Sequence, residues 1–459
     1  MTAVFWFRRD LRLKDNEALN AAFGCEDGTT GQVAAIYSFD SRDFLKLEGI
    51  RQHSLHESLL SLSKDTGNLL HIVDSSSIET FASALYDSCV EIQANAVFAA
   101  ESFDPKDIAK QVMVAKFLES KGISLHLIGS AYAVRPGTVR KPDGTNYRVY
   151  TPFFKSWATL ADVSPKQLPK KITWLKVSQS VDIPQPTKES PIKVVAGESF
   201  ALRTFKRFRD RALDSYDEKR NRADLSGTSH LSHALAHGEI HPRTLLAELG
   251  DSPAHEVFRK EIAWREFYAD VLFHYPHTVD DYYEPRFKRL KYDSGEKAEE
   301  KFLAWATGQT GFPMVDAGMR QLLAEGWMHN RVRMIVASFL VKDLHLEWTL
   351  GADHFEKHLS DFDAASNSHG WQWTAGCGTD ASPYYRIFNP ILQGLKFDPN
   401  GDYVRKYIPE LRHLEGSSAH EPWEVFDGYQ AGYPIQIVDH NTERNESLAR
   451  LEELKHLAG

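Results

Sequence analysis

The sequence predicts an α/β domain with a doubly wound parallel sheet at the N-terminus and an all-α domain at the C-terminus. Short apolar runs alternate with helical stretches up to residue 131, prolines and glycines interrupt the periodicity over 132–198, and helical periodicity dominates afterwards. A chain of 459 residues is long enough for two to three domains. We therefore expect an α/β domain over 1–131, an interdomain linker over 132–198 and a helical domain over 199–459.

Apolar runs mark the expected strands of the first domain. They cover residues 3–7, 33–39, 69–73, 96–100 and 125–129. Polar helical stretches such as 50–64 and 106–121 separate them. Apolar strands that alternate with helices are typical of a parallel sheet with helices on both faces. No GxGxxG motif follows the first run, so a nicotinamide-type dinucleotide site is not expected here.

After the linker, the helical pattern replaces the strand pattern. Expected helices cover residues 199–213, 230–237, 242–249, 255–273, 299–307, 314–325, 327–341, 353–359 and 441–456. The sequence contains no internal repeat and no low-complexity tail, so we expect one helical domain and no repeat architecture.

The composition is typical of a soluble globular protein, with 42% hydrophobic and 25% charged residues. No apolar run approaches the roughly 20 residues of a membrane-spanning helix, and no signal peptide is recognisable. Three widely spaced cysteines, Cys25, Cys89 and Cys377, favour reduced thiols and a cytoplasmic location. The net charge of −9 argues against a generally nucleic-acid-coating protein but leaves room for a local basic groove.

The segment 326–334 has an unusual helical face. Trp327, Asn330, Arg331 and Met334 fall at helical offsets 0, 3, 4 and 7. We expect an aromatic ring, an amide, a guanidinium and a thioether on one face, where an ordinary core helix would carry leucine and isoleucine.

The segment 361–373 combines carboxylates, an amide and indoles. These are Asp361, Asp363, Asn367, Trp371 and Trp373. Such a combination is typical of a polar lining beside a flat aromatic ligand. A helix cap followed by a tryptophan-containing core helix explains the segment alone, but the two segments together favour a ligand site.

The segment 227–238 places Thr228, Ser229 and Ser232 at a helix start that Gly238 ends. Hydroxyls and backbone N–H groups at a helix start suit a phosphate, although an ordinary N-cap has the same pattern.

Histidines in and after this segment resemble a metal-binding stripe. His230, His233, His237 and His241 fall at offsets 0, 3, 7 and 11. Gly238 interrupts the helix before the last of them, and no cysteine or carboxylate pattern completes a zinc site. No metal is therefore expected.

The segment 260–272 places Glu261, Trp264, Arg265 and Tyr268 at offsets 0, 3, 4 and 7. A carboxylate and an indole on one helical face can hold a base, the first by hydrogen bonds and the second by stacking. An amphipathic helix with an Arg–Glu pair has the same pattern.

Seven motifs together resemble the DNA photolyase/cryptochrome family. They are FWFRRDLRLKDN at 5–16, GTSHLS at 227–232, IAWREFY at 262–268, TGFPMVDAGMRQL at 310–322, GWMHNRVRM at 326–334, NSHGWQW at 367–373 and DASPYYRIFNP at 380–390. They occur in the family's order from residue 5 to about residue 440, and they are most similar to bacterial class I cyclobutane pyrimidine dimer photolyases. The resemblance implies an antenna-type α/β domain, a helical FAD-binding domain and light-driven repair of such dimers in DNA.

The resemblance also implies how FAD, reduced in the active form, is bound. It assigns the phosphates to Tyr216, Thr228, Ser229, His230, Leu231 and Ser232. It assigns the flavin to Asp361 and Asp363, with Arg333 paired to Asp361 and Asn367 facing flavin N5. Further cofactor contacts match Arg265 and Asn330.

For DNA, the resemblance implies a dimer flipped out of the duplex between the indoles of Trp264 and Trp373. Further dimer contacts match Glu261, Asn330 and Met334, and DNA contacts match Arg220, Arg331 and Gln393. Adjacent histidines are typical of photolyases for (6-4) photoproducts, whereas this chain has His329 and Asn330. A cyclobutane dimer is therefore the expected substrate.

The catalytic groups that the resemblance implies are Glu261, Asn367, Trp371 and Trp348. Glu261 would steady the dimer radical anion, and Trp371 and Trp348 would form a tryptophan relay that serves photoreduction of FAD. The outermost donor of the relay is missing from its usual place, and Tyr292 and Trp305 are the candidates.

Several alternatives stay open. The chain could be a cryptochrome-like photoreceptor, or a photolyase restricted to single-stranded DNA. Lys106 and Asp107 depart from the folate-binding pattern of the family, so a folate, a deazaflavin, another flavin or no antenna is compatible with the sequence. The expected protein is a monomer in the bacterial cytoplasm, associated with the nucleoid in use, without membrane contact.

Overall fold

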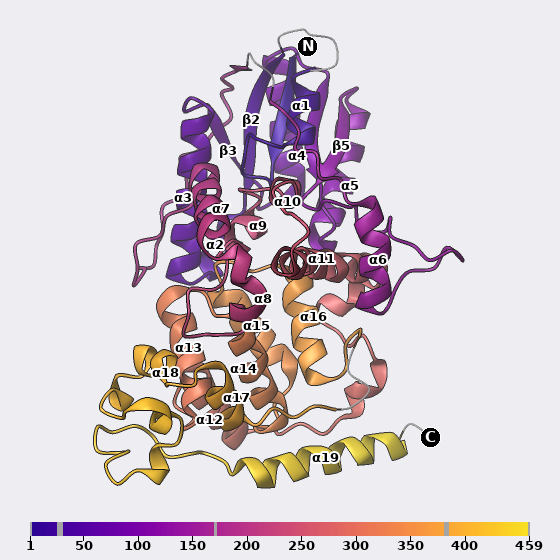
Figure 1. Cartoon of the computed structure of the whole chain (residues 1–459). Coiled ribbons are helices and arrows are strands. Elements are labelled where there is room, and N and C mark those ends of the chain that lie inside the picture. The colour runs from indigo at the N-terminus through magenta and orange to yellow at the C-terminus, as the bar shows by residue number, and fades with distance from the viewer. Residues whose placement is uncertain (1, 25–30, 169–171, 381–384, 458–459) are drawn as a thin grey trace. The chain divides into compact units, whose positions relative to one another are not determined.

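The computed structural model describes residues 2–24, 31–168, 172–380 and 385–457 (Figure 1). Contacts within the chain divide it into two compact units. The first is Met1–Asp214 with Ser229–His274, and the second is Ser215–Thr228 with Tyr275–Gly459. The domain boundaries expected at residues 131 and 198 stay a prediction, because the units follow packing and are not continuous in sequence.

A parallel sheet forms the centre of the first unit (Figure 1). Its strands lie in the order β3 (Leu70–Asp74), β2 (Gln32–Phe39), β1 (Thr2–Phe7), β4 (Ala96–Glu101) and β5 (Ser124–Ser130), and β6 (Thr173–Trp174) pairs with β2. All these pairings are parallel. The strand order reverses between β1 and β4, as in doubly wound folds. The predicted fold class of the N-terminal part is confirmed.

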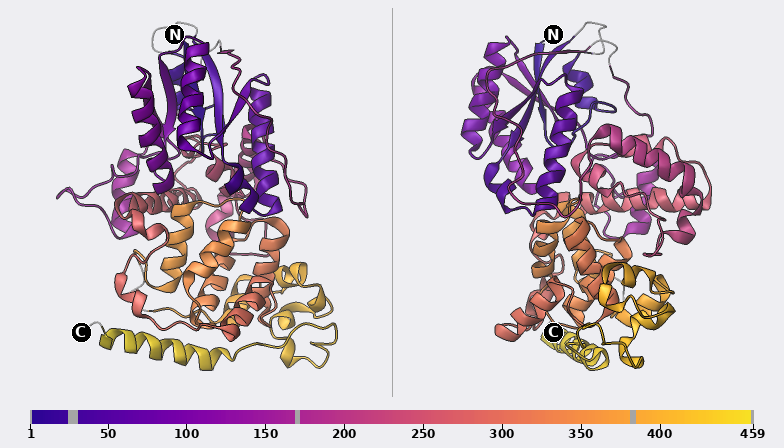
Figure 2. Two further views of the ribbon diagram at one scale, coloured as in Figure 1. Left: turned by 180° about the vertical axis from the view of Figure 1, so that it is seen from behind. Right: turned by 90° about the vertical axis from the view of Figure 1, so that its left-hand side faces the viewer.

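The alternating side chains of β1 separate the core of this unit into two layers. Phe5 and Phe7 belong to one buried cluster, and Val4 and Trp6 belong to the other. Helices cover both faces of the sheet (Figure 2). These helices are α1 (Glu17–Ala22), α2 (Ser41–Lys46), α3 (Gly49–Asp65), α4 (Ile78–Glu91) and α5 (Pro105–Ser120).

The later part of the first unit is helical and includes a helix within the expected linker. Its helices are α6 (Tyr150–Leu160), α7 (Glu198–Arg211), α9 (Ser232–His237), α10 (Pro242–Leu246) and α11 (Pro253–His274). Trp157 of α6 is fully buried, and its Nε1 donates to Glu266 of α11 at 2.6 Å. Glu266 also accepts from the backbone N–H groups of Ala133 and Val134 at 2.6 and 3.0 Å. A buried carboxylate on α11 therefore fixes the linker.

The second unit consists of helices. They are α8 (Tyr216–Lys219), α12 (Glu296–Ala306), α13 (Pro313–Glu325), α14 (Asn330–Lys342), α15 (Trp348–His358), α16 (Ala364–Ala375), α17 (Pro390–Phe397), α18 (Asp402–Tyr407) and α19 (His440–Leu457). Short 3-10 turns are η2 (Leu213–Ser215), η3 (Pro276–Val279), η4 (Pro285–Arg289), η5 (Pro409–Leu411), η6 (Gly416–His420) and η7 (Pro422–Glu424). No strand occurs in this unit among the residues that the structure describes, in agreement with the all-α prediction.

The packing of α13 on α14 requires a glycine. A Cβ on Gly318 of α13 would lie 2.4 Å from Cγ1 of Val332 of α14. This distance is far below van der Waals contact, so a larger residue would push the two helices apart. The close approach of the two helices therefore depends on the absence of a side chain at residue 318.

One expected helix starts later than predicted. The helix expected over 327–341 is α14, which begins at Asn330. Gly326 ends α13 in the left-handed conformation with φ 62°, and His329 caps α14 by accepting the N–H of Arg331 at 3.1 Å. Trp327 therefore lies between two helices, and the prediction that it shares a helical face with Asn330, Arg331 and Met334 is wrong.

In the described part of the chain, no helix is both long and apolar enough to cross a membrane. Cys89 and Cys377 are free and buried. Cys25 lies outside the described residues.

The carboxyl group of Asp270 on α11 is buried and makes the pH dependence of stability testable. Its Oδ1 accepts the N–H of Gly137 at 2.7 Å, and burial raises the pKa of Asp270 to about 6. The folded protein holds this proton up to about pH 6, whereas an unfolded chain releases it near pH 4. Stability therefore falls as the pH rises through this window.

We predict that Asp270→Asn, which keeps the acceptor and removes the charge, raises the midpoint of thermal unfolding at pH 7.5. The gain corresponds to at most about 3 kcal/mol and disappears near pH 4. Thermal unfolding at several pH values measures it. A gain of the same size at both pH extremes would contradict the assignment.

Candidate functional site

Arg333 and Asp361 form a nearly buried ion pair in the second unit. Arg333, on the first turn of α14, donates from Nη2 to Asp361 Oδ2 at 2.7 Å and from Nε to the carbonyl of Met328 at 2.8 Å. The side chain of Asp361 is 1% exposed. Ser360, beside it, donates its backbone N–H to the carbonyl of Gly326 at 2.8 Å. The pairing that the family resemblance implied is therefore present.

The second carboxylate oxygen of Asp361 is buried and has no hydrogen-bond partner among the described residues. Leaving a buried polar atom without a partner costs roughly 1–3 kcal/mol, and more for a charged group. Asp361 Oδ1 is thus an acceptor that requires a donor from outside the protein.

Asp363 and Asn367 lie on the first turns of α16. Asp363 is the N-cap, and its Oδ1 accepts the N–H of Ser366 at 2.9 Å. Asn367 donates from Nδ2 to the carbonyl of Ala352 in α15 at 3.1 Å. This bond fixes the plane of the amide, so its oxygen has a defined direction.

This donor and acceptor set fits a flavin. The N–H edge of the isoalloxazine ring and the ribityl hydroxyls are donors of the kind that Asp361 Oδ1 requires, and a planar amide such as that of Asn367 can bond to a ring nitrogen. Arg333, Asp361 and Asn367 would hold the flavin, which supplies one-electron chemistry when bound.

Indoles next to this cluster are deeply buried. Trp371 of α16 and Trp348 of α15 are 2% and 0% exposed. Trp371 contacts Trp305, with ring centroids 6.1 Å apart. Gly351 makes room for it, since a Cβ there would lie 2.1 Å from the indole of Trp371.

The two candidates for the outermost donor occupy different places. Trp305 lies directly beside Trp371 and is itself 0% exposed. Tyr292 is connected to Trp348 through Tyr282, whose ring lies 6.0 Å from Trp348 and whose hydroxyl lies 3.1 Å from that of Tyr292. Two aromatic branches therefore extend from the buried indoles.

The second unit also contains residues expected to contact DNA. Arg331 donates to the side-chain oxygen of Asn221 at 2.9 Å and lies over the ring of Phe397. Its Nη1 also lies 3.5 Å from the sulfur of Met334. The short helix α17 therefore packs beside α14 at this point.

Other expected DNA residues belong to further segments of the second unit. Arg220 lies over the ring of Tyr216 at 5.8 Å. Trp373 donates from Nε1 to the carbonyl of Asp380 at 3.2 Å, and Gln393 lies on α17. Ala381, Ser382, Pro383 and Tyr384 of the 380–390 motif lie outside the described residues.

In the first unit, Trp264 of α11 is stacked by a residue that the sequence analysis did not identify. The ring of Tyr150 lies 3.7 Å from that of Trp264 at an interplanar angle of 8°. The hydroxyl of Tyr150 donates to the carbonyl of Lys260 at 2.7 Å. Glu261 lies three residues before Trp264 on the same helix. No sequence pattern connects Tyr150 with Trp264, because they belong to different helices.

Arg265, expected at the cofactor, binds within the first unit. It donates to the carbonyls of Ala131 and Leu235 at 2.9 and 3.3 Å, and its guanidinium lies over the ring of Tyr132. These contacts fix the chain at the end of the sheet.

The expected phosphate-binding segment precedes a short helix. Thr228 belongs to the second unit, whereas Ser229, His230, Leu231 and Ser232 belong to the first. Helix α9 begins at Ser232 and ends at Gly238, which is left-handed with φ 69°. Thr228 and Ser229 therefore lie before the helix and not on its first turn.

The histidines of this region do not form a metal cluster within the described chain. His241 caps α10 and its Nε2 lies 3.0 Å from the carbonyl of Ser130. Burial lowers the pKa of His241 well below its usual value, so it is neutral in the folded protein.

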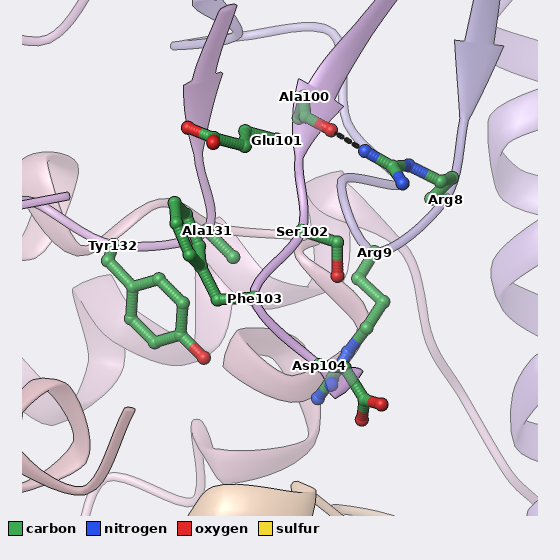
Figure 3. Close-up of a pocket in the computed structure, with 9 residues that line it drawn as sticks. All are labelled: Arg8, Arg9, Ala100, Glu101, Ser102, Phe103, Asp104, Ala131 and Tyr132. Carbon is green, nitrogen blue, oxygen red and sulfur yellow. Dashed lines mark hydrogen bonds between the residues drawn. The ribbon is translucent and has the colours of Figure 1, made fainter. Parts of the chain in front are cut away.

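A recess lies at the carboxyl ends of β1, β4 and β5 (Figure 3). It is lined by Arg8, Arg9, Ala100, Glu101, Ser102, Phe103, Asp104, Ala131 and Tyr132. It contains about 370 Å³ of empty space, part of it open to solvent. Ser102 donates to Asp107 at 2.8 Å. Because the strand order reverses between β1 and β4, this is where a doubly wound sheet places a ligand.

Family models and curated proteins match most of this chain. Residues 258–453 match the model of the FAD binding domain of DNA photolyase, and residues 3–171 match the model of DNA photolyase. The deoxyribodipyrimidine photo-lyase of Agrobacterium fabrum is 38% identical and covers 98% of each chain.

Solved structures are also similar to this chain. The crystal structure of a bacterial class III photolyase from Agrobacterium tumefaciens has a TM-score of 0.90 at 36% identity and covers 99% of this chain and 98% of its own. An archaeal photolyase from Sulfolobus tokodaii with two FAD molecules has a TM-score of 0.83 at 25% identity and covers 99% and 100%. The expectation that the chain is most similar to class I photolyases stays a prediction.

We predict that Asp361→Asn weakens FAD binding. The amide cannot form the ion pair with Arg333, and its nitrogen cannot accept a hydrogen bond from the flavin. Purified variant should lose at least about tenfold in FAD affinity, since charge-assisted hydrogen bonds contribute roughly 1.5–3 kcal/mol. Absorbance of the bound flavin after dialysis measures this, with Asp353→Asn on α15 as the control. Full retention of FAD in Asp361→Asn would contradict the role of Asp361.

The buried Arg333–Asp361 ion pair, the unsatisfied carboxylate oxygen and the adjacent indoles all lie within residues 258–453, which match the FAD binding domain of DNA photolyase. Relatives that are more than 30% identical to this chain over nearly its whole length lead to the same conclusion. The chain belongs to the DNA photolyase family.

Proposed function

We propose that this chain repairs cyclobutane pyrimidine dimers in DNA in a reaction driven by light. The observation that carries the proposal is the Asp361 carboxylate, held by Arg333 with one oxygen unsatisfied, beside Asn367 and buried indoles. Arg333, Asp361 and Asn367 would hold reduced FAD there, and the cofactor would supply light-driven one-electron chemistry to the dimer with no net oxidation. The relatives named deoxyribodipyrimidine photo-lyase support this function.

In this proposal, the cofactor is held by residues of both segments that the sequence analysis singled out. Asp361 and Asp363 bind the flavin and ribityl edge, and Arg333 orients Asp361. Asn367 bonds to the ring, and Asn330 is a further contact. Residues 228–232, with Tyr216 and Arg265, serve the phosphate side.

The lesion is bound by aromatic and polar groups. Trp264 and Trp373 provide two flat walls, and Glu261, Asn330 and Met334 bind the bases. Tyr150 stacks on Trp264, so the plane of this indole is preorganised. Arg220, Arg331 and Gln393 bind the DNA strand.

Glu261 acts on the reacting dimer. Its carboxyl group shares a proton or a hydrogen bond with the carbonyl oxygen that gains negative charge, and thereby steadies the radical anion until the ring opens. No nucleophile and no metal is required, since the bonds that break are weakened by the added electron.

Trp371 and Trp348 serve reduction of the enzyme and not repair. Trp371 passes an electron toward the flavin pocket and is refilled along one of two branches, through Trp305 or through Trp348, Tyr282 and Tyr292. The contact of 6.1 Å between the rings of Trp371 and Trp305 supports the first branch, and the contact of 6.0 Å between those of Trp348 and Tyr282 supports the outer step of the second.

The recess of Figure 3 is the proposed place of an antenna chromophore of folate or flavin type. The archaeal neighbour with two FAD molecules supports an antenna in this family. A monomer in the cytoplasm that acts on the nucleoid remains the expected state of the protein.

A photoreceptor function is the second candidate, because the Synechocystis cryptochrome structure has a TM-score of 0.86 at 25% identity. Repair of a dimer-containing oligonucleotide in light, with a dark control, separates the two functions. Parallel duplex and single-stranded substrates test whether repair is restricted to single strands.

We predict opposite effects for two substitutions in this assay. Glu261→Ala should lower the repair yield several-fold while FAD stays bound, because the radical anion loses its hydrogen-bond partner. Trp371→Phe should slow photoreduction of oxidised enzyme but leave repair unchanged after chemical reduction of FAD. Equal repair by Glu261→Ala and the native protein, or loss of both reactions in Trp371→Phe, would contradict these roles.

We also predict that Tyr150→Ala weakens binding of dimer-containing DNA by about tenfold, since an aromatic stack contributes roughly 0.5–1.5 kcal/mol beyond the buried area. Tyr150→Phe keeps the ring and should bind almost like the native protein. Equilibrium binding to a fluorescent oligonucleotide measures the effect, and FAD content is the control. Native affinity in Tyr150→Ala would show that Trp264 needs no support.

A further inference from the structure

Helix α7 has one apolar face and one strongly basic face. Ala201, Thr204, Phe205 and Phe208 are buried. The opposite face carries four exposed cations, which we call the α7 stripe: Arg203, Lys206, Arg207 and Arg211. The spacing of three and four residues places them along one line on the helix.

The charges of the α7 stripe are not paired with carboxylates in the part of the chain that the structure describes. No salt bridge joins any of its four cations to a carboxylate among the described residues. Asp210, which lies on the same face, is paired with Arg209 at 2.9 Å, and Arg209 also binds Glu248 at 2.7 Å. The charges of the stripe therefore remain available to a partner.

This arrangement has a cost in the absence of a partner. Arg203 and Arg207, and Arg207 and Arg211, are like charges four residues apart, and each such pair destabilises a helix by roughly 0.2–0.5 kcal/mol. The chain as a whole has a net charge of −9, so the stripe does not follow from a basic composition. A polyanion would relieve the repulsion.

The dimensions of the stripe match a nucleic-acid strand. The helix rises about 12 Å from Arg203 to Arg211, and one strand of duplex carries a phosphate about every 3.4 Å along the axis. Three to four phosphates thus face the stripe. Arginine, which makes up most of it, binds phosphate through two parallel N–H groups.

Sequence distance connects the stripe with Arg220, which is proposed to bind the DNA strand. Arg211 precedes Arg220 by nine residues, and a chain of this length reaches at most roughly 30 Å. About nine base pairs of duplex cover the same length at 3.4 Å each. One DNA molecule bound at Arg220 therefore extends far enough to meet α7.

We propose that the α7 stripe binds the phosphates of the duplex that flanks the dimer. The inference rests on the proposed repair function and adds a second, sequence-independent contact to it. The stripe contributes affinity and salt dependence for long substrates, whereas the lesion pocket alone binds short ones.

The test uses the full-length protein with FAD. The triple variant Arg203→Gln/Lys206→Gln/Arg207→Gln is compared with Lys106→Gln/Lys116→Gln/Lys121→Gln, which removes the same number of exposed charges from α5 and its end. Binding to a dimer-containing duplex of about 30 base pairs is measured from about 50 to 200 mM salt, a range over which phosphate contacts are resolved.

We expect the log–log salt slope of the α7 variant to be shallower by about 2–3, since each lost phosphate contact removes roughly 0.9. Affinity at about 50 mM salt should fall at least tenfold, and the α5 control should keep the native slope. Light-driven repair of a dimer in an oligonucleotide of about five nucleotides, which has too few phosphates to serve both the lesion site and the three to four positions of the stripe, should be unchanged in both variants.

An α7 variant with the slope of the α5 control would overturn the proposal. So would an equal loss of affinity for the short oligonucleotide, because the stripe would then act at the lesion. Binding of anionic phosphatidylserine vesicles that is lost only in the α7 variant, with an unchanged DNA slope, would assign the stripe to a lipid surface. Absence of light-driven repair in the native protein would reject the repair function and leave the salt slope to test the stripe separately.

Discussion

The Arg333–Asp361 ion pair is the interaction on which the arrangement of the site depends. A carboxylate that is almost completely buried is stable only with charged or hydrogen-bonding partners. Arg333 is one partner, and it is itself held by the carbonyl of Met328. Since Gly326 binds Ser360 through its carbonyl, the turn between α13 and α14 and the chain before α16 form one unit. The direction of Asp361 Oδ1 follows from these contacts and not from the ligand.

The same turn explains why neighbouring residues are placed so well for binding. Gly326 ends α13 with a left-handed backbone, and Gly318 brings α14 within van der Waals contact of α13. Asn330 then occupies the first position of α14, four residues before Met334. Gly326 and the cap at His329 set the start of α14, and this start determines which side chains share its first turn with Arg333, the partner of Asp361.

The fold could be predicted from the sequence where local pattern and tertiary packing agree. Buried parallel strands are continuous apolar runs, and for this reason each expected strand lies within a residue or two of its observed bounds. The start of α14 could not be predicted from periodicity, because the cap is the side chain of His329 and not a serine or an aspartate. Helix α6 was hidden by the prolines and glycines around it, although Trp157 is fully buried.

The residues of the site also divide into those with a local sequence signal and those without one. Asp361, Asp363, Asn367 and Trp371 lie in one segment, and their local spacing indicated a ligand site. Long-range partners left no such signal: Tyr150 binds the carbonyl of Lys260 and Arg331 binds Asn221, each across 110 residues. Such pairs arise only when the chain is folded, and neither helical nor strand periodicity records them. The family resemblance supplied the pairing of Arg333 with Asp361 but not the stacking of Tyr150 on Trp264.

The charge at a given place on the surface depends more on local ion pairs than on the overall composition. In the first unit, exposed arginines such as Arg42 and Arg135 bind neighbouring carboxylates at 2.9 and 2.6 Å, so their charge is cancelled at short range. The cations of the α7 stripe have no such carboxylate among the described residues, although the whole chain is acidic. Salt screens the field of every exposed charge within a Debye length of about 8–10 Å. A DNA strand near α7 therefore experiences the nearby unpaired cations more strongly than the net charge of the whole chain. An acidic protein can therefore bind a polyanion at a place where its cations have no carboxylate partners. For this reason the local salt-bridge pattern is a better guide to the binding face than the isoelectric point.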